Sequence, residues 1–200
     1  MVISVVVPTL TGREDLEEQT RVAYKATSSG TEIEWILVKD KGVAGEAWNV
    51  GADLASGDFL LLGCDDMVPH SGWLETAVTA AEEGVYPAPR ILNTDGGLQN
   101  CGTFGGGMTL GELRDGAPVT VSEIPFFPRE WWTKDMCLPI HYYSDDWLAF
   151  LARDSGLRVE VRRDYCFTHL GGTIGRERVT GRKAMEDRAD FLIAVTDRLS

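Results

Sequence analysis

Two adjacent aspartates, Asp65 and Asp66, are the first residues whose type and spacing indicate chemistry. They follow the apolar residues 59–62 at the end of a strand predicted over 58–62, and precede a helix predicted over 71–83. Neighbouring carboxylates repel each other, so they are stable side by side only when solvated, hydrogen-bonded at a helix start, or neutralised by a cation. The pair is therefore a candidate cation site at the end of a strand.

A second pair, Asp145 and Asp146, follows Ser144, where another helix is predicted to begin. Serine favours the N-cap position and carboxylates stabilise the positive end of a helix dipole, so a structural role is open. The functional alternative is that one carboxylate is a general base, which must sit near a substrate hydroxyl. His169, which precedes two glycines, is open either as a hydrogen-bonded core residue or as a metal ligand.

The elements that must position these side chains alternate along the first half of the chain. Continuous apolar or β-branched runs predict buried strands, and the stretches between them predict helices. Short connections favour an α/β layered fold with a mostly parallel central sheet. The predicted strands cover 2–7, 32–38, 58–62 and 84–90, and the predicted helices cover 13–28, 45–55 and 71–83.

In such sheets, ligands bind beyond the carboxyl ends of the strands. Pro8 and Thr9 follow the first predicted strand, Asp40 follows the second, and Asp65 and Asp66 follow the third. We therefore expect all five residues to lie at one edge of the sheet, where a ligand can reach them.

The second half of the chain departs from this alternation. Residues 91–140 are rich in glycine, proline and aromatic residues, which predicts irregular structure with short strands covering the site. A strand over 156–161 follows the helix that begins at Ser144. Residues 176–200 predict an amphipathic C-terminal helix, with candidate core contacts at Ala189, Leu192, Ile193 and Val195.

Length and composition set the class of protein. The 200 residues are 44% hydrophobic and 25% charged, which is typical of one globular domain with a sizeable core. No run approaches the roughly 18 apolar residues of a membrane-spanning helix. The first residues lack a secretory signal pattern, and the four cysteines contain no C-x-x-C pair. These features favour a cytoplasmic protein with free thiols.

The formal net charge of −12 is unevenly distributed. Residues 1–152 hold 9 basic and 23 acidic residues, a balance of −14, whereas residues 153–200 hold 10 and 8, a balance of +2. An acidic surface repels phosphate backbones, so the charge argues against general nucleic-acid binding.

Taken together, these motifs resemble the inverting glycosyltransferases of family 2, in particular rhamnosyltransferase-like members, over roughly residues 2–175. VVVPTL resembles the first strand of that family, and ILVKDKG resembles its strand ending in an aspartate. NVGADLASGDFLLLGCDDMVPHSGWLE resembles the stretch leading into the D-x-D motif, and APRILNTDGGLQNCGTFG the segment that follows it. SDDWLAFLARDSGLRVEV resembles the E-D-x-D-L helix with its strand, and THLGGT a histidine-and-glycine turn.

The resemblance implies a Rossmann-like GT-A fold, the nucleotide-diphospho-sugar transferase fold, in a single domain over 1–200. Residues 1–90 would form the nucleotide-binding half, residues 91–175 the acceptor and catalytic half, and 176–200 a C-terminal helix. The residues that it assigns to the nucleotide are Pro8, Thr9, Asp40, Asn49 and Asp65. Those assigned to a metal ion, Mn²⁺ or Mg²⁺, are Asp65, Asp66 and His169. It makes Asp145 the catalytic base, with Asp146 as the second candidate.

Three positions depart from the family pattern. Gly63 stands where the D-x-D motif has its first aspartate, and Ser144 and Trp147 replace two acids of the E-D-x-D-L motif. Residues 110–143, which should shape the acceptor site, match nothing in the family.

The activity implied is metal-dependent, inverting transfer of a sugar from a UDP-, GDP- or dTDP-sugar to the hydroxyl of an acceptor that the sequence does not identify. The chemistry agrees, because a departing diphosphate needs a cation held by carboxylates and direct displacement needs one base. Two alternatives stay open: a non-catalytic nucleotide- or carbohydrate-binding module of the same fold, and a sugar-1-phosphate nucleotidyltransferase. The second lacks its glycine-rich basic loop, because PTLTGRED has one glycine and one arginine.

Overall fold

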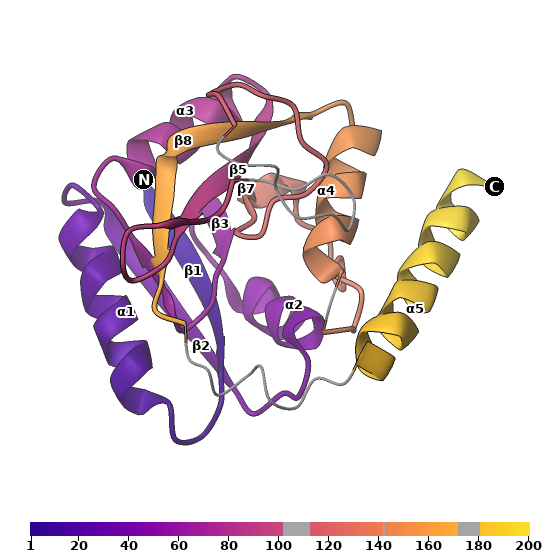
Figure 1. Ribbon diagram of the computed structural model, residues 1–200, viewed down its shortest axis with the longest axis horizontal. Helices are drawn as coiled ribbons and strands as arrows, with labels where there is room; N and C mark the ends of the chain where they lie inside the picture. Colours follow the sequence, from indigo (N-terminus) through magenta and orange to yellow (C-terminus); the bar gives the residue numbers. More distant parts are fainter. Residues whose placement is uncertain (102–112, 142, 172–180) are drawn as a thin grey trace.

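The computed structural model describes residues 1–101, 113–141, 143–171 and 181–200 (Figure 1). The chain has a mixed α/β fold, as predicted. The helices are α1 (Glu14–Thr27), α2 (Ala44–Leu54), α3 (Trp73–Glu82), α4 (Ser144–Asp154) and α5 (Gly181–Leu199), with one 3₁₀ turn, η1 (Arg129–Trp131). The strands are β1 (Val2–Thr9), β2 (Glu32–Lys39), β3 (Phe59–Leu62), β4 (Met67–Pro69), β5 (Val85–Leu92), β6 (Leu98–Asn100), β7 (Phe126–Pro128) and β8 (Arg158–His169).

The strands form two four-stranded sheets rather than one central sheet. The first has the order β2-β1-β3-β7, in which β1 is parallel to both β2 and β3 and β7 is antiparallel to β3. β1 and β2 are in register as far as Thr9 and Lys39, and the amide of Asp40 donates to the carbonyl of Thr9 at 3.0 Å. The two strands therefore end side by side, which brings their terminal polar residues to the same edge.

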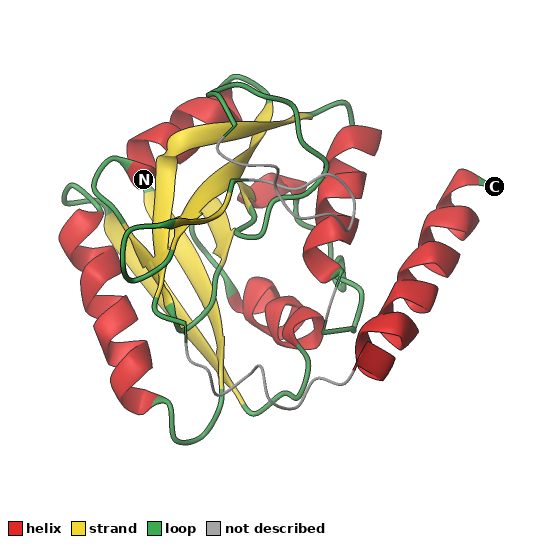
Figure 2. Ribbon diagram, viewed as in Figure 1, coloured by secondary structure: helices red, strands yellow, loops and turns green. Residues whose placement is uncertain are grey.

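Both faces of the first sheet are covered, which explains the continuous apolar run of β1. Val5 belongs to a core cluster with Tyr24 of α1 and Trp73 of α3, whereas Val6 packs in a second cluster with Trp48 of α2 and Leu148 of α4. Figure 2 shows the strands between α1 on one side and α2 and α4 on the other. Successive side chains of a strand point to opposite faces, so the apolar residues of β1 have apolar partners on both sides of the sheet.

A glycine in the middle of α2 sets how closely this helix lies on the sheet. A Cβ atom at Gly51 would lie 2.2 Å from Cγ1 of Val6 and 3.0 Å from Cγ2 of Val38. Glycine weakens a helix by roughly 1 kcal/mol relative to alanine, but here it lets α2 approach β1 and β2.

The second sheet has the order β4-β8-β5-β6. The sequence predicted its strand β8 only over 156–161, but the strand continues to His169. Beyond an irregularity in the pairing with β5, the buried residues Tyr165, Cys166 and Phe167 extend it. The short strand β4, which was not predicted, pairs antiparallel with the end of β8, with Met67 opposite His169. This pairing places His169 directly beside Asp66.

Three of the four core contacts predicted for the C-terminal helix are wrong, and the fourth, Val195, is half-buried. Leu192 and Ile193 are 51% and 60% exposed, and Ala189 is exposed too. α5 lies beside α4 at the edge of the molecule (Figure 1), where the ring of Phe191 stacks on Tyr143 at 5.7 Å. Residues 176–180 of the predicted helix lie outside the described residues. Among the helices that the structure describes, none is long and apolar enough to cross a membrane.

Candidate functional site

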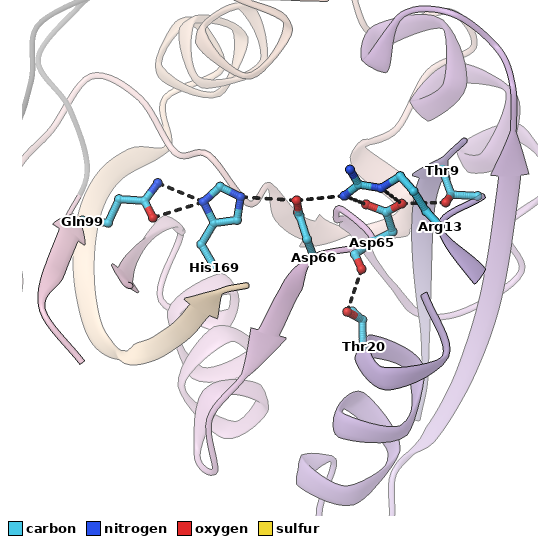
Figure 3. A network of polar contacts seen from close by, with 7 residues as sticks. All are labelled: Thr9, Arg13, Thr20, Asp65, Asp66, Gln99 and His169. Carbon is cyan, nitrogen blue, oxygen red and sulfur yellow. Dashed lines mark hydrogen bonds and ion pairs between the residues drawn. The ribbon is translucent and has the colours of Figure 1, made fainter. Parts of the chain in front are cut away.

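Asp65 is fixed by both its backbone and its side chain just beyond β3. The hydroxyl of Thr9, the last residue of β1, donates to Oδ2 of Asp65 at 2.6 Å, and the hydroxyl of Thr20 on α1 donates to its carbonyl at 2.8 Å (Figure 3). Asp65 is 5% exposed. The sequence predicted that Thr9 and Asp65 would meet at the sheet edge, and the structure brings them together.

Arg13 is a residue of the site that the sequence interpretation missed. It immediately precedes α1, and its Nε and Nη2 donate to Oδ2 and Oδ1 of Asp65 at 2.8 and 2.7 Å. Nη2 also donates to Oδ2 of Asp66 at 3.0 Å. The hydrogen bond to Asp65 is the main cause that raises the pKa of the guanidinium. One arginine therefore pairs with both carboxylates.

His169 reaches the same cluster from the end of β8. Its Nε2 lies 3.3 Å from Oδ2 of Asp66, and its Nδ1 lies within hydrogen-bond distance of the side-chain amide of Gln99 (Figure 3). Burial works to raise the pKa of Asp66, but the hydrogen bond and charge of His169, followed by those of Arg13, outweigh it and lower the pKa. The resemblance-based expectation that Asp66 and His169 lie together thus agrees with the geometry.

The same contacts bear on the predicted Mn²⁺ or Mg²⁺. Two carboxylates and an imidazole are suitable ligands by type. However, both oxygens of Asp65 already accept hydrogen bonds from Arg13, and the described residues contain no group of three or more His, Cys, Asp or Glu side chains arranged to hold a metal ion. As arranged here the residues do not fit a bound cation, and the cofactor stays a prediction.

Asp40, at the end of β2, holds the loop after β1. Its carboxylate accepts hydrogen bonds from the amide and the hydroxyl of Thr11 at 2.9 and 2.6 Å, and these bonds lower its pKa, the side-chain bond most strongly. Asp40 has a φ of +56°, in the left-handed region that aspartate tolerates better than most residues. Its predicted contact with the nucleotide stays a prediction.

Asn49, on α2, makes two side-chain hydrogen bonds to the backbone of Cys137. Its Nδ2 donates to the carbonyl of Cys137 at 2.9 Å, and its Oδ1 accepts from the amide of Cys137 at 2.8 Å. The side chain is 7% exposed. Asn49 therefore ties the segment before α4 to α2, and its predicted contact with the nucleotide stays a prediction.

A cavity of about 230 Å³ opens at the carboxyl ends of β1, β2 and β3. One part of its lining is apolar and the other carries the charged cluster. The lining includes Pro8, Leu10, Val38, Val43, Ala44, Ala47 and Trp48, then Thr9, Arg13, Asp65, Asp66, Lys41 and His141. Pro8, Thr9, Asp65 and Asp66 are thus gathered around one cavity, as the strand ends predicted, whereas Asp40 is not among the residues that line it.

The start of α4 differs from the prediction. Ser144 does not cap the helix, because the N-cap residue is Tyr143, with a φ of +67° and no side-chain cap. The hydroxyl of Ser144 instead donates to the carbonyls of Leu138 and Ile140 at 2.9 and 3.0 Å. A buried hydroxyl bound in this way anchors the loop that precedes the helix and leaves the helix start to the two aspartates.

Asp145 and Asp146 face different surroundings. Burial raises the pKa of Asp145, opposed by the backbone N–H groups of Asp145 and Asp146 at the helix start. Burial and then the charge of Asp145 raise the pKa of Asp146 to about 7. Asp146 lines a second cavity of about 250 Å³ beside α5, together with Arg153.

The thiol of Cys64, which lines the first cavity, is influenced by the charges of the first pair and of Asp145. Burial raises the pKa of Cys64, and the negative charges of Asp66, Asp65 and Asp145 raise it further. This half-buried thiol is thus influenced by carboxylates from two distant parts of the sequence, Asp65 with Asp66 and Asp145.

Glu123 is a second residue that the sequence interpretation missed. Its Oε1 accepts a hydrogen bond from Asn100, and its buried Oε2 has no hydrogen-bond partner in the described part of the chain. Burial, followed by the charge of Asp145, raises the pKa of Glu123 to about 8. It lies within residues 110–143, which match no family motif, so no signal in the sequence pointed to it.

Solved structures share this fold, although no protein-family model and no curated protein match the sequence. A197 from STIV matches 86% of this chain and 87% of its own, with a TM-score of 0.62 and 14% identity. S. aureus TarS, a glycosyltransferase, matches 84% of this chain with a TM-score of 0.54 and 14% identity. The chain spans 36% of the length of that TarS chain, and 60% of a second structure, TarS 1–349.

At this identity the likeness concerns the fold alone. The protein thus has a glycosyltransferase-like α/β fold, with a cavity at the carboxyl ends of its strands, where ligands of α/β sheets bind.

Proposed function

We propose that this chain is an inverting glycosyltransferase that moves a sugar from a nucleotide-diphosphate sugar to an acceptor hydroxyl. The observation that carries the proposal is the cavity at the carboxyl ends of the strands of a glycosyltransferase-like fold, lined by Arg13, Asp65 and Asp66. Cys64 also lines it, and the charge of Asp145 helps to raise the pKa of this thiol. The two halves of the chain supply the two functions that transfer needs, a site for the departing diphosphate and a base.

The cavity lining suits a nucleoside and its phosphates. Its apolar wall, which includes Val38 and Trp48, offers a surface for the base, and Asp40 lies at the end of the adjoining strand. The charged wall, with Arg13, offers hydrogen-bond donors to phosphate oxygens. We therefore place the base near β2 and the diphosphate near the Asp65–Asp66 pair.

Asp145 is the proposed base. It accepts the proton of the acceptor hydroxyl while that oxygen attacks the anomeric carbon from the face opposite the diphosphate. The bond from that carbon to the diphosphate oxygen breaks with its electron pair, so the configuration inverts. A raised pKa suits the role, because a base works best when its pKa lies near the working pH.

One observation favours a non-catalytic nucleotide-binding module instead. The backbone N–H groups at the start of α4 stabilise the Asp145 carboxylate, as they would for a purely structural residue. In that case the protein binds a nucleotide sugar but does not release its diphosphate.

The test is a thermal-shift screen with UDP-, GDP- and dTDP-sugars, in Mn²⁺ and in EDTA. A ligand at 100 times its Kd stabilises the folded form by about 2.7 kcal/mol, which is roughly 5–10 °C for a domain of this size. Asp65→Asn should abolish the shift, and Asp15→Asn, an exposed position on α1, is the matched control. If none of the three sugar-nucleotide classes shifts the parent, the proposed function is wrong.

A further inference from the structure

Arg13 holds both carboxylates of the Asp65–Asp66 pair at once (Figure 3). The guanidinium binds Asp65 with two nitrogens, at 2.7 and 2.8 Å, and one of these also binds Asp66 at 3.0 Å. The side chains of Arg13, Asp65 and Asp66 are only 17%, 7% and 14% exposed. A charge-assisted, bidentate pair of this kind is among the strong polar contacts of a protein.

The oxygens that Arg13 occupies are those that a divalent cation would need. Mg²⁺ and Mn²⁺ bind carboxylate oxygens at about 2.0–2.2 Å, a distance that leaves no room for an N–H group on the same side of the oxygen. Oδ2 of Asp65 also accepts the hydroxyl of Thr9. Of the four carboxylate oxygens, Oδ1 of Asp66 alone has no hydrogen bond or ion pair to a described residue.

We propose that Arg13 and a divalent cation compete for the Asp65–Asp66 carboxylates. The protein then carries Arg13 as the internal cation of this pair, in the place that the family resemblance gives to a metal ion. This proposal rests on the proposed function, which is the reason to expect a metal ion at this pair. The competition itself can be measured without any sugar nucleotide.

Charge supports this role of Arg13. The guanidinium offsets one of the two negative charges of the Asp65–Asp66 pair, and the hydrogen bond and charge of His169 act on Asp66 from the other side. Both carboxylates are therefore paired without a metal ion.

The experiment measures Mn²⁺ binding and thermal stability of the full chain without nucleotide. In EDTA, Arg13→Ala should lower Tm by roughly 5–10 °C, because it removes the guanidinium that pairs with two buried carboxylates. Mn²⁺ should restore most of that loss, whereas it should raise the Tm of the parent by less than about 1 °C, the shift of a site that is barely occupied. By calorimetry, Mn²⁺ should bind the Arg13→Ala variant at least about tenfold more tightly than it binds the parent. A tenfold change in affinity corresponds to about 1.4 kcal/mol of competition from Arg13.

Arg21→Ala is the matched control. Arg21 lies on α1, the helix that Arg13 precedes, and pairs with Glu18, but its side chain is 31% exposed and is not part of the cavity lining. Exposed pairs contribute little, so this variant should shift Tm by less than about 2 °C and bind Mn²⁺ as the parent does.

Equal Mn²⁺ affinity of the parent and Arg13→Ala overturns the competition. If Arg13→Ala does not fold, Arg13→Lys decides, because an ammonium keeps the charge but loses the fork. Mn²⁺ should bind this variant more tightly than the parent, and equal affinity again overturns the proposal. If Mn²⁺ binding follows these expectations but no sugar nucleotide binds the parent, the competition stands and the proposed function fails.

Discussion

Glu123→Gln should stabilise the protein, and the gain should depend on pH. The pKa of Glu123 in the folded state is about 8, against an ordinary value of 4.5, because the carboxyl is buried beside Asp145. A raised pKa means that the folded state favours the protonated form. The contribution of Glu123 to stability is therefore complete below pH 4.5, and it is lost as the pH rises from 4.5 through about 8.

The magnitude follows from the difference between the two pKa values. Each pH unit above 4.5 costs about 1.36 kcal/mol until the folded-state pKa is reached. The cost at pH 7 is thus about 3 kcal/mol at most. Glutamine keeps the oxygen that accepts from Asn100 and has no charge to bury. In a domain of this size, 3 kcal/mol corresponds to roughly 6–12 °C in Tm.

The assay is urea unfolding of the parent and the variant at several pH values between 4.5 and 8.5. The free-energy gain of Glu123→Gln should be near zero at the lowest pH, rise to about 3 kcal/mol at pH 7 and level off above pH 8. Glu82→Gln, an exposed position on α3, should change the unfolding free energy by less than about 0.5 kcal/mol. A gain that is the same at every pH, or a loss at pH 7, refutes the buried, protonated state of Glu123.

Two further outcomes are expected. Asp40→Ala should raise the donor KM more than it lowers kcat, the pattern of lost uniform binding; a pure loss of kcat in steady-state kinetics contradicts its placement near the base or ribose. Asn49→Ala should lower the unfolding free energy by about 1–3 kcal/mol, because it leaves the backbone N–H and carbonyl of Cys137 unpaired. A donor Kd that changes tenfold, with unfolding free energy unaltered, would instead support the direct nucleotide contact that the sequence resemblance predicted.

Much of the sheet could be predicted because hydrophobic patterns are local. The run of β1 indicates burial on both faces, and the strand ends place Thr9 and Asp65 at one edge. Patterns failed where packing decides which side of a helix is buried. On α1 the valine at 22 is 53% exposed, whereas Tyr24 is fully buried against Trp73. The size of the tyrosine ring and its aromatic neighbours, rather than the hydropathy of valine, select that face.

The features of the site that the sequence did not predict depend on contacts between distant parts of the chain. Arg13 pairs with an aspartate 52 residues away, and PTLTGRED contains nothing that indicates this fold-back. The position of His169 depends on β4, a strand of three residues that is too short to leave a pattern. For α5 the sequence correctly predicted an amphipathic helix but could not supply a partner for its apolar side.

The central claim is that Asp145 acts as a base in glycosyl transfer. The most direct measurement compares Asp145→Asn with Asp146→Asn, using the sugar nucleotide that the thermal-shift screen selects and following release of the nucleotide diphosphate. Water can serve as the acceptor, so the measurement does not depend on knowing the natural one. Asparagine keeps the size of the side chain but cannot accept a proton.

Asp145→Asn should reduce release by roughly 10²-fold or more, the usual contribution of a positioned base, with donor Kd and Tm nearly unchanged. Asp146→Asn should cost much less, since Asp146 faces the other cavity. In the parent, release should increase with pH as Asp145 ionises, and this dependence should be absent in Asp145→Asn. Full activity of Asp145→Asn would contradict the assignment and leave these two aspartates with only the stabilisation of the start of α4.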